Sequence, residues 1–260
     1  EGLLSRTRDG LTGLQGRSAV DKAVDELFEN KIPHAVAMID FRNLGGLNEK
    51  LGHTGPTGAD RIIIESVVER LTPAVRQVGG EVYRCGGDEY VAIAPNMKAS
   101  ELKSLLNDVS GQIDIEVIKP NNLENLPHPK NYGLPTGVGI DFGCADSAMA
   151  KNRHDELKMA DRRCFDAKKD QKDIVVEREL QQGRKWVQVD GVYAPQKIAT
   201  ILQTMKRELE NEYRVNQEKT VGSRSYGRGS DTRGRPEAGS AIGGSGLDQR
   251  SRGTPKIPSG

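Results

Sequence analysis

Residues 83–94 read YRCGGDEYVAIA, with two glycines and two adjacent acids set between two apolar runs that alternate as strands do. This pattern predicts a hairpin with a tight turn at Gly86 and Gly87 and with Asp88 and Glu89 at its tip. The turn alone leaves two interpretations of the acids. They are either solvated side chains on an exposed turn whose glycines take positive φ, or members of a site that uses their charge.

Asp40 is a third acid that bears on this choice. It ends the apolar run HAVAMID, residues 34–40, which predicts a buried strand. If that strand is central in a sheet, Asp40 lies beside the hairpin tip and three carboxylates converge. Like charges at about 4 Å repel by ~1 kcal/mol even in bulk water, so such a cluster favours a bound divalent cation. Carboxylate oxygens suit a hard ion, which predicts Mg2+ or Mn2+ rather than zinc.

The rest of the chain alternates helix and strand patterns. Helical periodicity predicts helices over residues 17–30, 57–78, 98–109 and 154–169, and apolar runs predict strands over residues 34–40, 135–143 and 173–178 beside the hairpin. This order fits an α/β fold, an α+β sandwich in which an open central sheet is flanked by helices. A short hairpin over residues 185–194 and an amphipathic helix over residues 196–213 follow.

Composition divides the chain into three predicted parts. Residues 1–180 form the α/β domain, residues 181–218 a hairpin-and-helix extension, and residues 219–260 a tail of mostly Gly, Ser and Arg. The tail holds too few large apolar residues to offset its ordering entropy, so we predict that it is disordered. A flexible tail is the favoured interpretation, and an arginine-rich arm that contacts RNA or phosphate is the alternative.

The net charge, the cysteines and the hydropathy pattern argue against several classes of protein. The net charge is +1, so the chain is not expected to bind nucleic acid through its overall charge. Cys85, Cys144 and Cys164 form no C-x-x-C pair, which argues against a disulfide framework or a zinc site. No apolar run reaches the roughly 18 residues of a membrane span, so we expect a cytoplasmic protein in a reducing compartment. Because the sequence begins at Glu1 without Met, an upstream sensor or dimerisation domain is expected to be missing.

Five stretches, in order and in register over residues 8–176, are similar to the motifs of one family. RDGLTGLQGR (8–17) resembles the opening D-x-L-T-G-L-x-N-R, and MIDFRNLGGLNEKLGH (38–53) resembles the metal strand and nucleotide loop. RCGGDEY (84–90) resembles the signature turn, with Tyr90 in place of Phe. TGVGI (136–140) resembles an S-I-G-V strand, and ADRRCFDAK (160–168) matches A-D-x-A-L-Y-x-A-K in length. The family is that of the GGDEF domains, the bacterial diguanylate cyclases.

The resemblance implies a metal-dependent enzyme that condenses two GTP molecules into cyclic di-GMP and releases pyrophosphate at a homodimer interface. It implies metal ligands at Asp40, the Phe41 carbonyl, Asp88 and Glu89, with Asp88 or Glu89 also assisting removal of the 3′-proton. It implies nucleotide contacts from the backbone amides of Asn43, Leu44 and Gly45, from the turn glycines Gly86 and Gly87, and from the side chains of Asn48, Asp60, Lys168 and Lys172.

Several positions depart from the family pattern. Arg42 stands where a second acid is usual, and Gly45 stands where a phosphate-contacting Lys is usual. After His53 the stretch TGPTGAD is longer, so the base-reading acid aligns with Thr57 or, with an insertion, with Asp60. These departures support an alternative function, a catalytically degenerate module that binds GTP or a protein partner as a regulatory element. A cyclase with relaxed base choice is a third.

The family's R-x-x-D product-inhibition motif is also altered. Its two positions correspond to Gln77 and Gly80, which lack the charges needed to grip a guanine and a phosphate. Inhibition through that site is therefore not expected.

Overall fold

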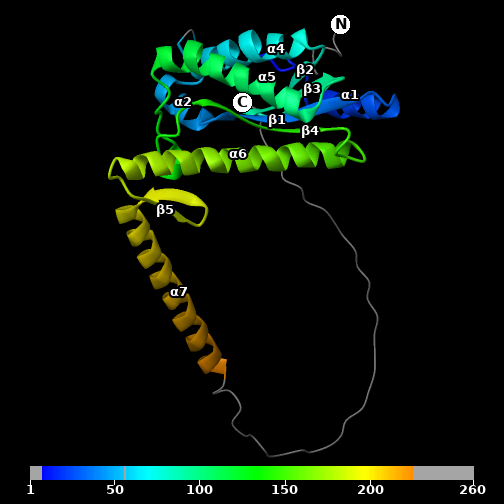
Figure 1. The fold of residues 1–260 in the computed structure, drawn as a ribbon. Helices are drawn as coiled ribbons and strands as arrows, with labels where there is room; N and C mark the ends of the chain where they lie inside the picture. Colours follow the sequence, from blue (N-terminus) through cyan, green and yellow to red (C-terminus); the bar gives the residue numbers. More distant parts are fainter. Residues whose placement is uncertain (1–7, 56, 225–260) are drawn as a thin grey trace, which may run out of the picture. The chain divides into compact units, whose positions relative to one another are not determined.

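The computed structural model describes residues 8–55 and 57–224, with side chains described up to residue 211. The described residues up to Glu208 form one compact unit, and those from Leu209 to Arg224 belong to another. The first unit carries the sheet, its helices and the site, and the description below concerns this unit (Figure 1).

An antiparallel four-stranded sheet in the order β2-β3-β1-β4 is the centre of this unit. Its strands are β1 (His34–Arg42), β2 (Glu81–Arg84), β3 (Glu89–Pro95) and β4 (Gly139–Asp146). The β1 residues from His34 to Ile39 are all buried, as expected for a central strand with both faces covered. The register pairs Asp40 with Glu89 on β3 and with Asp141 on β4.

Helices cover both faces of the sheet (Figure 1). One face packs against α2 (Leu44–Leu51), α3 (Ala59–Ile63), the π-helical η2 (Ile64–Leu71), α4 (Thr72–Gln77) and α5 (Ala99–Ile113). The other packs against α1 (Arg17–Glu29) and the long α6 (Arg153–Gln181). Because side chains alternate along a strand, Ile39 and Phe41 enter the first core while Met38 enters the second. Asp40 and Arg42 therefore lie on the α6 side.

The predicted α/β sandwich and the hairpin are confirmed, and the helix predicted over residues 57–78 is present over residues 59–77 as α3, η2 and α4. The strand predicted over residues 173–178 is wrong, because these residues continue α6. No glycine or proline interrupts the chain from Arg153 to Gln182, and Val175 is buried against Leu134 and Tyr193. Tertiary packing thus overrides the strand propensity of the Ile-Val-Val run.

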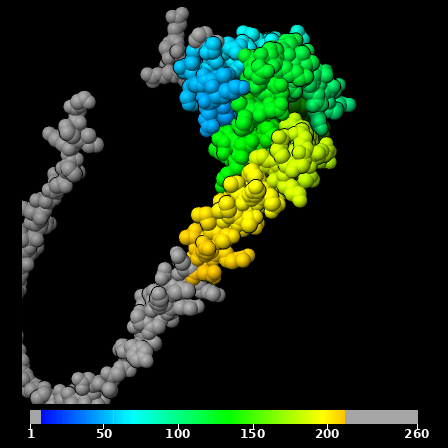
Figure 2. All heavy atoms as spheres, turned by 90° about the vertical axis from the view of Figure 1, so that its left-hand side faces the viewer, coloured from blue at the N-terminus to red at the C-terminus, as the bar shows by residue number. Residues whose placement is uncertain are grey.

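The chain between α5 and β4 has short helical turns only: η3 (Asp114–Ile118), η4 (Lys119–Asn121) and η5 (Pro129–Asn131). A small hairpin after α6, formed by β5 (Trp186–Val189) and β6 (Val192–Pro195), packs on this segment. The Tyr193 amide donates to Asn131 Oδ1 at 3.2 Å. Figure 2 shows this face, with the green middle segment beside the blue α2 region, the yellow-green end of α6 and the yellow hairpin.

The last helix, α7 (Gln196–Arg224), extends beyond the predicted residue 213. Residues 219–224, assigned from composition to a disordered tail, are helical. Residues 225–260, the remainder of that predicted tail, lie outside the described part of the chain, and the boundaries of the three predicted domains stay a prediction.

Gly143 brings α6 and β4 together. A Cβ at this position would collide with the backbone of α6 at Ala160, Arg163 and Cys164, so only glycine allows the two elements to approach this closely. The helix that carries Lys168 and Lys172 is therefore seated directly on the strand that carries Asp141.

Candidate functional site

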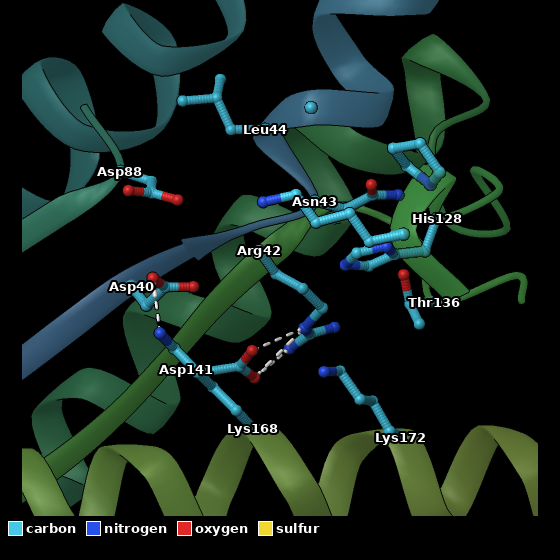
Figure 3. Close-up of a pocket in the computed structure, with 13 residues that line it drawn as sticks. Asp40, Arg42, Asn43, Leu44, Asp88, His128, Thr136, Asp141, Lys168 and Lys172 are labelled. Atoms are coloured by element: carbon cyan, nitrogen blue, oxygen red, sulfur yellow. Dashed lines mark hydrogen bonds and ion pairs between the residues drawn. The ribbon is translucent and has the colours of Figure 1, made fainter. Parts of the chain in front are cut away.

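A pocket of about 230 Å³ opens at the carboxyl end of β1, between α2, α6 and the segment before β4. Figure 3 shows its lining, with Asp40 and Asp88 at one end and His128, Thr136 and Lys172 at the other. The full lining is Asp40, Arg42, Asn43, Leu44, Gly45, Asp88, His128, Pro129, Lys130, Thr136, Asp141, Lys168 and Lys172. Seven of the residues predicted to bind metal or nucleotide are thus brought together: Asp40, Asn43, Leu44, Gly45, Asp88, Lys168 and Lys172.

The signature turn reaches the pocket through Asp88. Asp88 lines the pocket, and its carbonyl accepts from the Phe41 amide at 2.7 Å, which fixes the hairpin tip against the end of β1. Neither Gly86 nor Gly87 has positive φ, so the interpretation that they supply it is wrong. Gly86 instead leaves room for Glu89, whose Oε2 would lie 3.2 Å from a Cβ there.

Arg84 holds the turn from outside the pocket, a role that the sequence did not reveal. Its guanidinium donates to the Gly86 and Gly87 carbonyls at 3.2 and 2.6 Å, and to Asp9 Oδ1 at 2.8 Å. Asp9 also accepts from the amide and hydroxyl of Thr12 at 2.7 and 2.6 Å. The opening D-x-L-T motif thus anchors the arginine that shapes the acidic turn.

Asp40 is paired with Lys168 across the pocket. Lys168 Nζ lies 2.7 Å from Asp40 Oδ2, and the Asp40 side chain is 15% exposed. Burial raises the pKa of Asp40, Lys168 lowers it, and the charges of Asp88 and Asp141 raise it further, so the net shift is upward. Burial alone would lower the pKa of Lys168. The hydrogen bond to Asp40 and the negative charge of Asp40 outweigh burial, so the net shift of the Lys168 pKa is upward. The carboxylates therefore repel one another, and a cation relieves this repulsion.

Arg42 points into the same pocket and is neutralised there by Asp141. Arg42 Nε lies 3.1 and 3.0 Å from the two Asp141 oxygens, and Nη2 lies 2.6 Å from Oδ1. A Cβ on Gly139 would lie 3.4 Å from the guanidinium, so the missing side chain leaves room for Arg42 to lie across β4. The departure at Arg42 therefore comes with a partner acid that the sequence analysis did not single out.

Asn43 shapes the start of α2. It adopts the left-handed conformation with φ of 60°, and its Oδ1 accepts from the Gly46 amide at 3.2 Å. Its Nδ2 donates to the Leu126 and Pro127 carbonyls at 3.0 and 3.2 Å. The amides of Leu44 and Gly45, in the first helical turn, have no acceptor within the helix and are available to an anion.

One wall of the pocket was missed by sequence analysis: His128, Pro129, Lys130 and Thr136. One signal could have pointed to this wall. Residues 110–134 carry no predicted helix or strand, and a stretch of that length without secondary structure in a compact domain is commonly functional. Burial lowers the pKa of His128, and the charges of Lys172 and Lys130 lower it further. This wall is therefore neutral at His128 and positive at Lys130, and Lys172 of α6 adds a second positive charge beside it.

Other predicted site residues lie outside the pocket lining. Glu89 is exposed and lines a separate hollow with Arg17, Asp21 and Arg153. Asn48 lies one turn along α2, and Asp60 lies in the first turn of α3. Phe41 has a fully buried side chain, and the roles predicted for its carbonyl and for Asn48, Asp60, Gly86, Gly87 and Glu89 stay predictions.

The expected cluster of three acids differs from what the structure shows. Among the described residues, no three or more His, Cys, Asp or Glu side chains are arranged to hold an ion. Asp40 and Asp88 share the pocket, and the pKa of Asp40 is raised mainly by burial and further by the charges of Asp88 and Asp141. Two carboxylates fit Mg2+, which commonly uses one or two of them together with substrate phosphates.

The cysteines are free, with Cys144 and Cys164 buried and Cys85 half-buried. Burial raises the pKa of both Cys144 and Cys164 to about 12, so neither is a reactive thiolate at neutral pH. Along the described residues, no helix combines the length and apolar character needed to cross a bilayer.

The fold and the pocket define an α/β domain in which the central strand β1 carries Asp40 near its carboxyl end. The carboxylate of Asp40 lies in one pocket with lysine side chains and with the backbone at the start of α2. The family model for the GGDEF domain of diguanylate cyclases matches residues 6–173. The chain belongs to this family.

Two curated relatives share part of the sequence. Cyclic di-GMP phosphodiesterase PdeB from Shewanella oneidensis is 28% identical over 160 residues, which cover 62% of this chain and 17% of that protein. Diguanylate cyclase DgcP from Escherichia coli is 32% identical over 109 residues, which cover 40% of this chain and 30% of that protein. The chain thus matches less than a third of the length of either relative.

Solved structures share the fold. The GGDEF domain of DgcB from Caulobacter crescentus, in complex with c-di-GMP, has a TM-score of 0.50 at 23% identity and covers 63% of this chain and 91% of that one. A form of DgcB with its coiled coil has a TM-score of 0.51 at 21% identity and covers 65% of this chain and 84% of that one.

Proposed function

We propose that the protein is a diguanylate cyclase that condenses two GTP molecules into cyclic di-GMP and releases pyrophosphate. The observation that carries the proposal is the shared pocket of Asp40, Asp88 and Lys168 within a GGDEF domain. In this proposal Asp40, Asp88 and the Phe41 carbonyl hold Mg2+ or Mn2+. The ion, when bound, would neutralise phosphate charge during attack of a ribose 3′-hydroxyl on the α-phosphorus.

The chain's own groups would position the triphosphate. The Leu44 and Gly45 amides would bind a phosphate at the start of α2, which Asn43 fixes through three hydrogen bonds. Lys168 would leave Asp40 for a phosphate oxygen once a cation takes over the carboxylate, because its stem already reaches the site. Asp88 would accept the 3′-proton directly or through water, since its carboxylate lies at the hairpin tip beside Asp40.

The active species would be a homodimer. Each domain binds one GTP in this proposal, and ring closure needs two 3′-hydroxyls facing two α-phosphorus atoms, so a two-fold pair of identical half-sites is the direct solution. Guanine would be read by Asn48 and Asp60. A GTP substrate and free buried thiols agree with a cytoplasmic location.

Incubation of the protein with GTP and Mg2+ or Mn2+, with products identified by mass, tests the proposal. Asp40→Asn and Asp88→Asn should each lower turnover by at least about 100-fold, because each removes charge that acts on the transferring phosphoryl group. Asp108→Asn, an exposed acid on α5, is the matched control and should leave turnover unchanged. Equal turnover in the parent and both site variants would overturn the assignment.

A non-catalytic GTP-binding module is the second candidate. The Arg42 and Asp141 pair inside the pocket and the uncharged Gly45 favour it, as does the similarity to a relative named as a phosphodiesterase. GTP that binds in the presence of Mg2+ without turnover at any protein concentration would establish this module and exclude the cyclase.

A further inference from the structure

The pocket has two ends of opposite charge (Figure 3). The ion pairs of the described lining join Lys168 to Asp40 and Arg42 to Asp141, and neither pair involves Lys130 or Lys172. Negative charge that remains after pairing is therefore at Asp88, and positive charge that remains is at these two lysines. The cationic end belongs to residues that no family motif assigns, apart from Lys172.

The cationic end lies over the start of α2. A Cβ on Gly45 would lie 3.5 Å from Pro129 Cγ, so Pro129 stands next to the place that a longer side chain at position 45 would cross. The wall residues on either side of Pro129 are His128 and Lys130. An anion bound to the Leu44 and Gly45 amides would therefore lie next to the side chains of His128 and Lys130.

The wall is held by contacts on both sides. The Asn43 side chain donates to the Leu126 and Pro127 carbonyls, and His128 forms a bridge with Leu134 through its amide at 2.8 Å. Asn131 is 3% exposed and accepts from the Tyr193 amide of the hairpin that follows α6. His128 and Lys130 thus stand on a braced turn rather than on a free loop.

His128 has an unmet hydrogen bond in this arrangement. Its Nδ1 is buried without a partner within the described part of the chain, and its pKa is lowered by burial and by the two nearby lysines. An anion in the pocket would offset the repulsion among these groups and favour the protonated, donating form of the imidazole.

We infer that His128 and Lys130, with Lys172, form a subsite for the terminal phosphates of a nucleoside triphosphate. Lys130 would supply from the segment before β4 the positive charge that the family usually carries at the position of Gly45, and His128 would donate a hydrogen bond. This inference rests on the proposed function, because it deepens the description of the same site. Its ligand is a di- or triphosphate chain, and the base and ribose play no part in it.

Calorimetric titration of the whole chain with inorganic tripolyphosphate, GTP and GMP tests the subsite without any need for turnover. Lys130→Met should weaken tripolyphosphate and GTP about ten-fold, through loss of one charge-assisted contact, and leave GMP unchanged. His128→Phe, which keeps a ring of similar width without donors, should weaken the same two ligands. Lys151→Met is the control, because this exposed lysine precedes α6, whose first residue, Arg153, lies about 23 Å along the helix from Lys168.

The outcomes separate the subsite from the cyclase. If tripolyphosphate binds through Lys130 and GTP is not turned over, the subsite stands and the cyclase proposal fails. If cyclic di-GMP is made and Lys130→Met binds GTP and tripolyphosphate as tightly as the parent, the cyclase stands and the subsite is overturned. A parent chain that binds no tripolyphosphate also overturns it. Melting temperatures of all variants establish that they are folded, which is expected because Lys130 is exposed.

Discussion

Asp141 holds the guanidinium of Arg42 with both carboxylate oxygens, and the two side chains are only 6% and 18% exposed. The pair joins the neighbouring strands β1 and β4 at the floor of the pocket. It explains how a cation can stand two residues after Asp40 without opposing a metal there, because its charge is already matched. A bidentate pair of this kind is also fixed in direction.

Removal of one partner of this pair should destabilise the folded protein. Asp141→Asn leaves the Arg42 charge partly buried and unmatched, so we expect a loss of about 3 kcal/mol in the free energy of unfolding and weaker binding of Mg2+. Urea titration measures the first effect and calorimetry the second. Asp166→Asn, which breaks an exposed pair with Arg162, should change stability by less than about 0.5 kcal/mol. Arg42→Gln added to Asp141→Asn should restore much of the lost stability, and a double variant no better than the single one would contradict the pairing argument.

The second prediction concerns the close approach of α6 to β4 at Gly143. Gly143→Ala should destabilise the protein by about 1 to 3 kcal/mol, because the added methyl meets the α6 backbone at Ala160 and Cys164. Since α6 carries Lys168, nucleotide binding should weaken as well. The control is Gly111→Ala in α5, where no atom lies within 4 Å of the added carbon. That change should stabilise the helix by about 0.5 to 1 kcal/mol, and a loss equal to that of Gly143→Ala would refute the close-approach argument.

Stability should depend on pH through His34. This fully buried side chain contacts Glu156 Oε2 at 3.0 Å and the Ile32 carbonyl at 2.7 Å. Burial acts to lower the pKa of His34, but these hydrogen bonds and the charge of Glu156 outweigh it and raise the pKa above 6.5. Protonated His34 therefore stabilises the folded state. This contribution is complete below about pH 6.5 and is lost as pH rises through the higher folded pKa.

Melting temperatures from pH 6 upward measure this effect. The parent should lose stability as pH rises above 6.5, and Glu156→Gln should flatten that part of the profile because it removes the charge that raises the His34 pKa. His154→Gln, at an exposed histidine, should leave the profile as it is in the parent. The same slope in all three proteins would exclude His34 as its source.

Product inhibition should be absent at the position of the family's R-x-x-D motif. Gln77 ends α4 and is exposed, and a Cβ on Gly80 would lie 2.5 Å from the Ile93 carbonyl and 2.8 Å from Val75 Cγ1. An aspartate at position 80 therefore requires the backbone to move. We expect Gln77→Arg with Gly80→Asp to lower the melting temperature without creating cyclic di-GMP inhibition. Inhibition of the parent that Gln77→Ala relieves would contradict this.

Turnover, if the proposed function holds, should depend on protein concentration. A doubly loaded dimer is the competent species in that proposal, so specific activity should rise with concentration over the micromolar range. Fusion of a parallel coiled coil ahead of Glu1 should raise turnover by raising the effective concentration. A specific activity that does not change on dilution, with a monomer seen throughout by light scattering, would argue for the non-catalytic module.

Local patterns predicted much of the fold and part of the site. The apolar run that ends in Asp40, the Gly-Gly-Asp turn and the helix that carries Lys168 each produce a strong signal within about 20 residues. Their order in the chain matches one family, so their meeting at one pocket could also be predicted. The edge strand β4, which carries Asp141, gave no such signal, because a single acid within an apolar run is common in strands.

The sequence by itself determined which segments around β1 are strands and helices, and it predicted Asp40, Asp88 and Lys168 as site residues, which the structure places in one pocket. Tertiary structure decided what no local pattern holds. It made residues 173–178 helical, because Val175 packs against Leu134 and Tyr193, and it placed Glu89 in another hollow although Glu89 pairs with Asp40 across the two strands. It also set Arg42 against Asp141 and brought Lys130 over the start of α2. These contacts join residues far apart in the chain, and only the packed sheet and helices bring them within reach of one another.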